Sequence, residues 1–206
     1  VPATPGADDN ASGTAAMLAC AEALSGVPGL PVGFVAFNGE EDGLLGSSEF
    51  AAALGGEHSL EVVHILEMVG YCQHGPGTQR SPIPAPLPLP DVGDFIGLLG
   101  NQASAPIVDR VLGLRGALTP GLPAVALKTY LGIERWLPVL HRSDHSPFWR
   151  AGVPAVLWTD TAEFRNPHYH RPTDTPDRLD YGFMLRVTQL LLGSVLHDPA
   201  LARSDR

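Results

Sequence analysis

Apolar runs alternate along this chain with amphipathic or Ala-rich stretches. Short apolar runs bounded by Gly or Pro predict strands, and longer stretches without Pro predict helices. The predicted strands are 32–37, 60–69, 94–99, 125–129 and 154–159, and the predicted helices are 11–24, 44–54, 105–114 and 179–196. This alternation predicts an α/β fold of three layers, in which a mixed, mostly parallel central sheet carries helices on both faces.

One segment breaks the alternation. Residues 71–93 carry Pro82, Pro84, Pro86, Pro88 and Pro90 on a two-residue period. A segment with so few backbone donors cannot be a central strand, so we expect an extended excursion across the surface. A linker between two domains is the alternative, but the flanking segments are too short to own separate cores. With 206 residues, of which 44% are hydrophobic, the chain 1–206 is expected to form one domain.

Charge and composition limit the classes of partner that we expect this chain to bind. The formal net charge is −9, Lys128 is the one lysine, and the arginines are scattered, so nucleic acid is an unexpected partner. No apolar run reaches the roughly 18 residues that span a bilayer, which argues against a membrane partner. Cys20 and Cys72 form neither a disulfide framework nor a metal-ligand spacing, and we interpret both as small apolar side chains. The chain begins with Val1 and shows no targeting segment, so it is expected to be processed or a fragment, and its compartment stays open.

Candidate chemistry starts from an acid pair. Glu40 and Glu41 follow the predicted strand 32–37 after Asn38 and Gly39, and ligands collect at the carboxyl ends of strands in open α/β sheets. Two adjacent carboxylates oppose each other's ionisation, and a cation beside them would remove that cost. Asp9, Glu67 and His170 are expected at other strand ends and complete a candidate ligand set.

Each candidate also fits an ordinary structural role. Glu40 and Glu41 fit a solvated turn, Asp9 fits a helix cap, and Glu67 fits an exposed strand end. His168 lies two residues from His170 and competes with it as a ligand. Ordinary causes rarely place an acid or a histidine at four such positions together, which favours a metal site.

Five motifs, in order, resemble the zinc exopeptidases of metallopeptidase family 28, a group that contains bacterial leucyl aminopeptidases and has glutaminyl cyclases as relatives. The resemblance runs from residue 6 to about residue 181. The motifs are Gly-Ala-Asp-Asp-Asn-Ala-Ser-Gly at 6–13, Asn-Gly-Glu-Glu-Asp-Gly-Leu-Leu-Gly-Ser at 38–47, Glu-Met-Val-Gly-Tyr at 67–71, Ser-Asp-His-Ser-Pro-Phe-Trp at 143–149 and His-Tyr-His-Arg-Pro-Thr-Asp-Thr at 168–175. The fold that this resemblance implies is the zinc-dependent exopeptidase fold.

The resemblance also implies a role for each candidate. Asp9 would bridge two metal ions, Glu41 and His170 would complete one zinc shell, and Glu67 would bind the other metal. Glu40 would be the general base for a water activated by the metal. The peptide bond between Asp9 and Asn10 would be cis.

Two departures from the family pattern affect the metal. Glu67 stands where family members more often have Asp, which is a milder change because Glu is also a sound ligand. Family members carry a further His ligand upstream, in a His-x-Asp segment, and here five residues precede Gly6. One zinc site (Asp9, Glu41, His170) is therefore expected to be complete, whereas the second keeps Asp9 and Glu67 and is expected to bind weakly.

Supporting residues have two interpretations each. Asp144 matches an acid that lines the site in the peptidases and cyclases, and it equally fits a cap for a helix at 146–150. Asp174 fits a partner that orients His170, or a cap for the last helix. Three aromatic side chains fit either a substrate pocket or the core: Tyr169, Phe164 and Trp158.

Three functions remain in view. The first is a metallo-exopeptidase, an aminopeptidase that acts on peptide substrates with zinc as cofactor. The second is a single-zinc, glutaminyl-cyclase-like acyltransferase, which needs one complete site. The third is a non-catalytic interaction domain on the same fold. The sequence leaves open the oligomeric state and the preferred substrate side chain.

Overall fold

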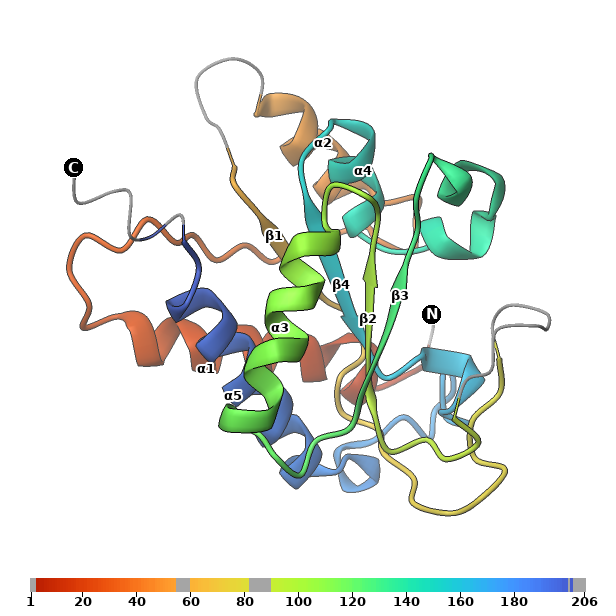
Figure 1. The fold of residues 1–206 in the computed structure, drawn as a ribbon. Helices are drawn as coiled ribbons and strands as arrows, with labels where there is room; N and C mark the ends of the chain where they lie inside the picture. The colour runs from red at the N-terminus through yellow and green to blue at the C-terminus, as the bar shows by residue number, and fades with distance from the viewer. Residues whose placement is uncertain (1–2, 55–59, 82–89, 200, 202–206) are drawn as a thin grey trace.

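Four strands form one mixed sheet in the computed structural model, which describes residues 3–54, 60–81, 90–199 and 201 (Figure 1). The strand order is β1-β4-β2-β3, with bounds Val63–Leu66, Ala155–Thr159, Ile96–Gly100 and Ala124–Lys128. β1 runs parallel to β4 and β2 parallel to β3, whereas β2 and β4 are antiparallel. The prediction of a mixed, mostly parallel sheet is confirmed.

Helices cover both faces of this sheet. α1 (Gly13–Leu24), α3 (Ala105–Leu118) and α5 (Tyr181–Leu196) pack on one face, and α3 crosses in front of the strands in Figure 1. α2 (Leu45–Ala53) and α4 (His145–Arg150) pack on the other face. Side chains of β4 alternate between the two layers, because successive residues of a strand point to opposite faces. Val156 and Trp158 join the first layer, and Leu157 joins the second.

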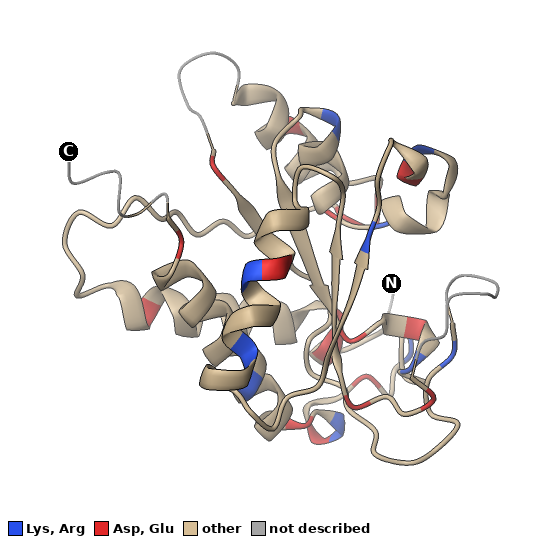
Figure 2. Cartoon of the chain, viewed as in Figure 1, with Lys and Arg blue, Asp and Glu red and all other residues tan. Residues whose placement is uncertain are grey.

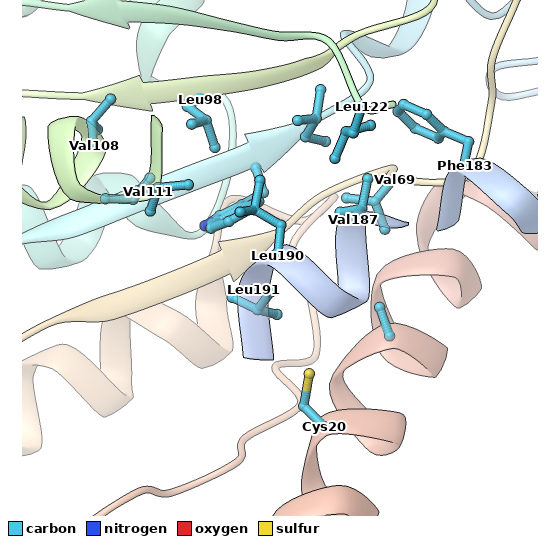
Figure 3. Close-up of a cluster of buried hydrophobic side chains, with 14 of the residues drawn as sticks. Cys20, Val69, Leu98, Val108, Val111, Leu122, Phe183, Val187, Leu190 and Leu191 are labelled. Atoms are coloured by element: carbon cyan, nitrogen blue, oxygen red, sulfur yellow. The ribbon is translucent and has the colours of Figure 1, made fainter. Parts of the chain in front are cut away.

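The larger core lies between the sheet and α1, α3 and α5 (Figure 3). Along α5, Phe183, Val187 and Leu190 are fully buried, and their spacing places them on one face of the helix. Asp180 caps this helix, since its side chain accepts a hydrogen bond from the backbone N–H of Phe183. The buried stripe fixes where α5 begins, and it thereby positions the loop that precedes the helix.

One predicted strand is wrong. Residues 32–37 form no strand, and Phe34 and Val35 are 39% and 42% exposed. An apolar run becomes a strand only where another strand offers a ladder, and no backbone hydrogen bond joins 33–37 to any strand among the described residues. Phe37 alone turns inward, where its ring lies 5.5 Å from that of Phe50.

The remaining predicted elements appear at nearly the expected bounds. Residues 82–89 of the Pro-rich segment lie outside the described part of the chain, and its described flanks carry neither helix nor strand. Short helical turns join the longer elements: η1 (Ala7–Ser12), η2 (Ile133–Trp136), η3 (Pro138–His141), η4 (Ala162–Phe164) and η5 (Pro176–Arg178). Within the described residues, every helix is too short or too polar to cross a bilayer.

Candidate metal centre

Acidic side chains from distant parts of the sequence lie together at the carboxyl ends of β1 and β4. Glu67 directly follows β1, Asp9 lies in the turn before α1, and Glu41 lies in the turn before α2. His170 comes from the loop between β4 and α5. Figure 2 shows several acidic positions close together at this end of the sheet. The structure therefore gathers the predicted ligands at one rim. The expectation that each follows a strand is wrong, since Glu67 directly follows one and the others reach the rim from turns and loops.

Asp9, Glu41 and His170 form a compact trio. Nε2 of His170 lies 2.8 Å from Oε1 of Glu41 and 3.1 Å from Oδ2 of Asp9. One ligand atom from each residue lies within 4.8 Å of the other two. These separations place all three donors around one point.

The donor set fits zinc. Nε2 of His170 is buried and makes no hydrogen bond to any described residue, even though two carboxylate oxygens are near it. A buried imidazole nitrogen without a hydrogen bond is costly unless something else binds it. One imidazole and two carboxylates are ligands that zinc takes, and three protein ligands leave a coordination position open.

Asp174 holds the Asp9 segment in place. Its two carboxylate oxygens accept hydrogen bonds from the backbone N–H groups of Asp8 (3.0 Å) and Asp9 (3.2 Å). Asp174 thus takes neither predicted role, because its oxygens face this backbone and Asp180 caps α5. The Asp9–Asn10 peptide bond is cis, as the resemblance implied. The Asn10 side chain bonds to the backbone of β1 and its extension, at Leu66 (2.8 Å) and Met68 (3.0 Å).

Glu40 stands beside the trio. Burial, followed by the negative charges of Glu41 and Asp144, raises the pKa of Glu40 to about 7. Burial and the charge of Glu41 likewise raise the pKa of Asp9 to about 6. A carboxyl with a pKa near neutrality can both take up and release a proton.

Asp144 combines parts of both predicted roles. It occupies the position before α4, but its side chain makes no hydrogen bond to that helix. Instead it accepts a hydrogen bond from the hydroxyl of Ser47 on α2. The negative charge of its carboxylate contributes to the raised pKa of Glu40.

Glu67 lies next to the trio and is not one of its members. Its Oε2 accepts a hydrogen bond of 3.0 Å from the hydroxyl of Ser143. Burial and the charges of Glu40 and Asp9 raise the pKa of Glu67 well above its usual value. Ser47 and Ser143 were both within recognised motifs, but their contacts join distant segments and leave no local signal in the sequence.

A cavity of about 260 Å³ opens beside these acids. Asp9, Glu40, Glu41 and Glu67 line one part of it, and the remaining wall is mainly apolar. The apolar wall includes Phe95, Leu99, Val125, Leu127, Val139 and Phe164.

The three candidate aromatic residues divide between the cavity and the core. Tyr169 and Phe164 line the cavity, and the Tyr169 ring stacks on His170 with 3.7 Å between centroids. Trp158 is fully buried in the core. The competing histidine, His168, is outside the trio and bonds to the Thr173 hydroxyl.

Comparisons with known proteins point to one family. The sequence model of one family, Peptidase family M28, matches residues 1–84 and 132–195. The chain is 39% identical to the protein YfbL of Escherichia coli over 89% of this chain, and 30% identical to aminopeptidase YwaD of Bacillus subtilis over 95%. It spans 57% and 38% of the lengths of these two relatives. LapB from Legionella pneumophila has a similar fold, with a TM-score of 0.71 and 23% identity over 94% of this chain and 47% of LapB.

Proposed function

Because the chain belongs to peptidase family M28, we propose that it is a zinc-dependent aminopeptidase, which removes the N-terminal residue of a peptide. One observation carries the proposal. The buried Nε2 of His170, which makes no hydrogen bond to a described residue, lies between the carboxylates of Glu41 and Asp9 at the edge of a largely apolar cavity. The name of the relative YwaD supports the same activity.

Asp9, Glu41 and His170 would hold the zinc ion. Zinc supplies a Lewis acid, which polarises the scissile carbonyl and lowers the pKa of water to about 7. Asp174 keeps Asp9 in place through the backbone, and Tyr169 keeps the ring of His170 oriented by stacking on it. These contacts fix the ligands before the substrate arrives.

Glu40 moves the proton. Its carboxylate takes a proton from the attacking water and returns it to the amine that leaves. Without metal, the charges of Glu41 and Asp144 raise the pKa of Glu40, and a zinc ion held beside it would favour the ionised form, which is the form that accepts the proton. Ser47 holds Asp144 in place through a hydrogen bond.

Glu67 is the candidate ligand for a second metal ion, with Asp9 shared between the two ions. Two carboxylates are fewer than the ligands that zinc usually takes, so we expect the second ion to bind more weakly. In our proposal the carboxyl groups of Glu67 and Asp9 also receive the positively charged N-terminus of the substrate, whose charge favours their ionised forms. This attraction favours an exopeptidase over an enzyme that cuts inside a chain.

The cavity suggests the substrate class. Its wall of Leu99, Val125, Leu127 and Val139 matches an apolar side chain, which gains about 25 cal/mol for each Å² removed from water. We therefore propose that peptides with a large apolar N-terminal residue, such as leucine, are the preferred substrates.

Three peptides test the proposal. One carries an N-terminal leucine, the second is the same peptide with an acetylated N-terminus, and the third begins with glutamine. With zinc present, we expect free leucine from the first peptide, no product from the second, and no ammonia-releasing cyclisation of the third. Cyclisation of the glutaminyl peptide without leucine release would favour the acyltransferase. No reaction with any peptide would favour a non-catalytic domain.

A further inference from the structure

A second cluster of metal-ligating side chains lies where the loop after β1 meets the start of α5. Sγ of Cys72 is 3.7 Å from Nε2 of His74, and the same nitrogen is 3.8 Å from Oδ2 of Asp180. The three ligand atoms all lie within 4.8 Å of one another. The cluster shares no residue with the trio of Asp9, Glu41 and His170.

We propose that Cys72, His74 and Asp180 bind a zinc-type divalent cation through Sγ, Nε2 and Oδ2. Zinc takes sulfur at about 2.3 Å and nitrogen or oxygen at about 2.0–2.2 Å, in a tetrahedral arrangement, so neighbouring ligand atoms lie about 3.4–3.7 Å apart. The two separations of 3.7 and 3.8 Å are close to that range. The 3.8 Å between Nε2 of His74 and Oδ2 of Asp180 exceeds the usual length of a hydrogen bond between nitrogen and oxygen, so an ion between these two atoms uses the spacing better than a direct bond does.

Two of the three ligands are held in place by the fold. The backbone N–H of Asp180 donates to the carbonyl of Gly70 (2.9 Å), and Oδ1 of Asp180 accepts from Phe183 at the start of α5. Oδ2 is thereby left facing His74. The backbone beside Cys72 is fixed as well, since Gln73 N–H donates to the carbonyl of Gly93 (2.8 Å), and Cys72 packs against the larger core.

His74 completes the site from outside. Its side chain is 69% exposed, so it can close over an ion that reaches the cluster from solvent. The charge around Cys72 is mixed, because Asp180 and Asp94 favour a cation while Arg165 and Arg186 oppose it. Loss of the thiol proton adds a negative charge, so a bound ion meets three negative groups against two positive ones. Three protein ligands leave one coordination position for water.

The bound ion would tie the loop after β1 to α5. The next residue toward β1, Tyr71, packs its ring against His168, with 5.9 Å between ring centroids. The link between this loop and α5 therefore extends, through Tyr71 and His168, to the loop that carries His170. The proposal concerns metal binding alone and does not depend on peptidase activity.

Cobalt tests the site with a signal that the trio of Asp9, Glu41 and His170 cannot give. Co²⁺ bound to a thiolate shows a sulfur-to-metal charge-transfer absorption, whereas a site of oxygen and nitrogen ligands does not. Titration of the metal-free protein with Co²⁺ should produce this absorption, and an excess of Zn²⁺ should remove it. The matched control is Cys20→Ala, because Cys20 is buried on α1 where this helix packs against α5, and its loss should leave the signal unchanged.

Variants at each of the three ligands test whether the absorption comes from this site. Cys72→Ser should abolish the absorption, and Asp180→Asn should weaken Co²⁺ binding while it preserves the helix cap, since Asn is also a good cap. His74→Ala should weaken binding by more than about tenfold, because a lost ligand costs at least as much as a lost outer partner. Absence of the absorption in the unaltered protein, or its persistence in Cys72→Ser, overturns the proposal. If Cys72→Ser does not fold, unchanged affinity in His74→Ala overturns it, since that side chain lies on the surface.

Discussion

Nε2 of His170 lies 2.8 Å from Oε1 of Glu41, although the two residues are far apart in the sequence. The loop before α5 and the turn before α2 must both be in place to create this contact. The relationship makes the assembly of the candidate metal centre depend on the whole fold, and it places Glu41, but not the adjacent Glu40, in the trio.

Replacing Glu40 by Gln should abolish peptide hydrolysis and leave the zinc content unchanged. An amide cannot take the proton, and general-base catalysis is typically worth about 10²–10⁴-fold, so turnover should fall by at least that range. Turnover and metal analysis on the same preparation measure both quantities. Glu49→Gln on the exposed side of α2 is the matched control. Full activity in Glu40→Gln would show that another group is the base.

Replacing Glu41 by Gln should remove the zinc ion of the trio, and activity with it. A neutral amide oxygen is a poorer zinc ligand than a carboxylate, and only two strong ligands would remain. Metal analysis after dialysis should show one zinc fewer per chain than in the unaltered protein. Asp42→Asn makes the same kind of change one residue away on the exposed turn, and it should retain the ion. Equal zinc content in both variants would contradict the assignment.

Replacing Val139 by Phe should reduce the size of the side chain that the cavity accepts. Val139 lines the apolar wall, so added volume there competes with a leucine side chain of the substrate. We expect kcat/KM for an N-terminal leucine to fall by about tenfold or more relative to an N-terminal alanine. Val27→Phe, at an exposed position, should leave this ratio unchanged. A parallel loss for both substrates would indicate general damage and count against the cavity as a specificity site.

His145, which is buried, and His64, which is partly buried, should each contribute less to the free energy of unfolding as the pH falls. Burial lowers the pKa of His64 and of His145 to about 4, whereas an unfolded histidine has a pKa of about 6.5. The unfolded chain therefore binds more protons between these values. The stabilisation is complete above about pH 6.5 and is lost as the pH falls toward about 4, by up to about 3 kcal/mol for each histidine.

Denaturant titrations with a chelator present, from pH 7 to pH 4, measure this loss. His64→Gln should flatten the curve, because its amide can still accept the hydrogen bond from Trp158 but does not titrate. His197→Gln, at an exposed position after α5, is the control and should keep the original slope. Identical slopes in all three proteins would show that His64 does not set the acid sensitivity.

Much of the fold was predictable because its signals are local. The strands β2, β3 and β4 and the helices α1, α2 and α5 were expected within two residues of their observed bounds. Burial on both faces produces continuous apolar runs, and a single amphipathic stripe marks α5. The prediction of a strand at 32–37 was wrong. It rested on apolar composition, which cannot show whether a neighbouring strand is available to pair with this segment.

The candidate site, too, was predictable from the sequence only in part. The motifs predicted that Asp9, Glu41 and His170 form one zinc shell, and the structure places these three residues together. The residues that support them depend on contacts between distant segments, such as Asp174 with the backbone at Asp8 and Asp9. Cys72 was interpreted as a small apolar side chain, because no metal-ligand spacing surrounds it in the sequence. Asp180, which faces it in the structure, lies on a different element.

Zinc titration of the metal-free protein tests the central claim most directly. Release of leucine from a leucyl peptide should be absent without zinc, should rise as zinc fills the trio, and should stay absent in His170→Gln at the same zinc concentration. His168→Gln, two residues away, should respond to zinc as the unaltered protein does. Leucine release by the metal-free protein, or by His170→Gln, would contradict a zinc centre built on Asp9, Glu41 and His170.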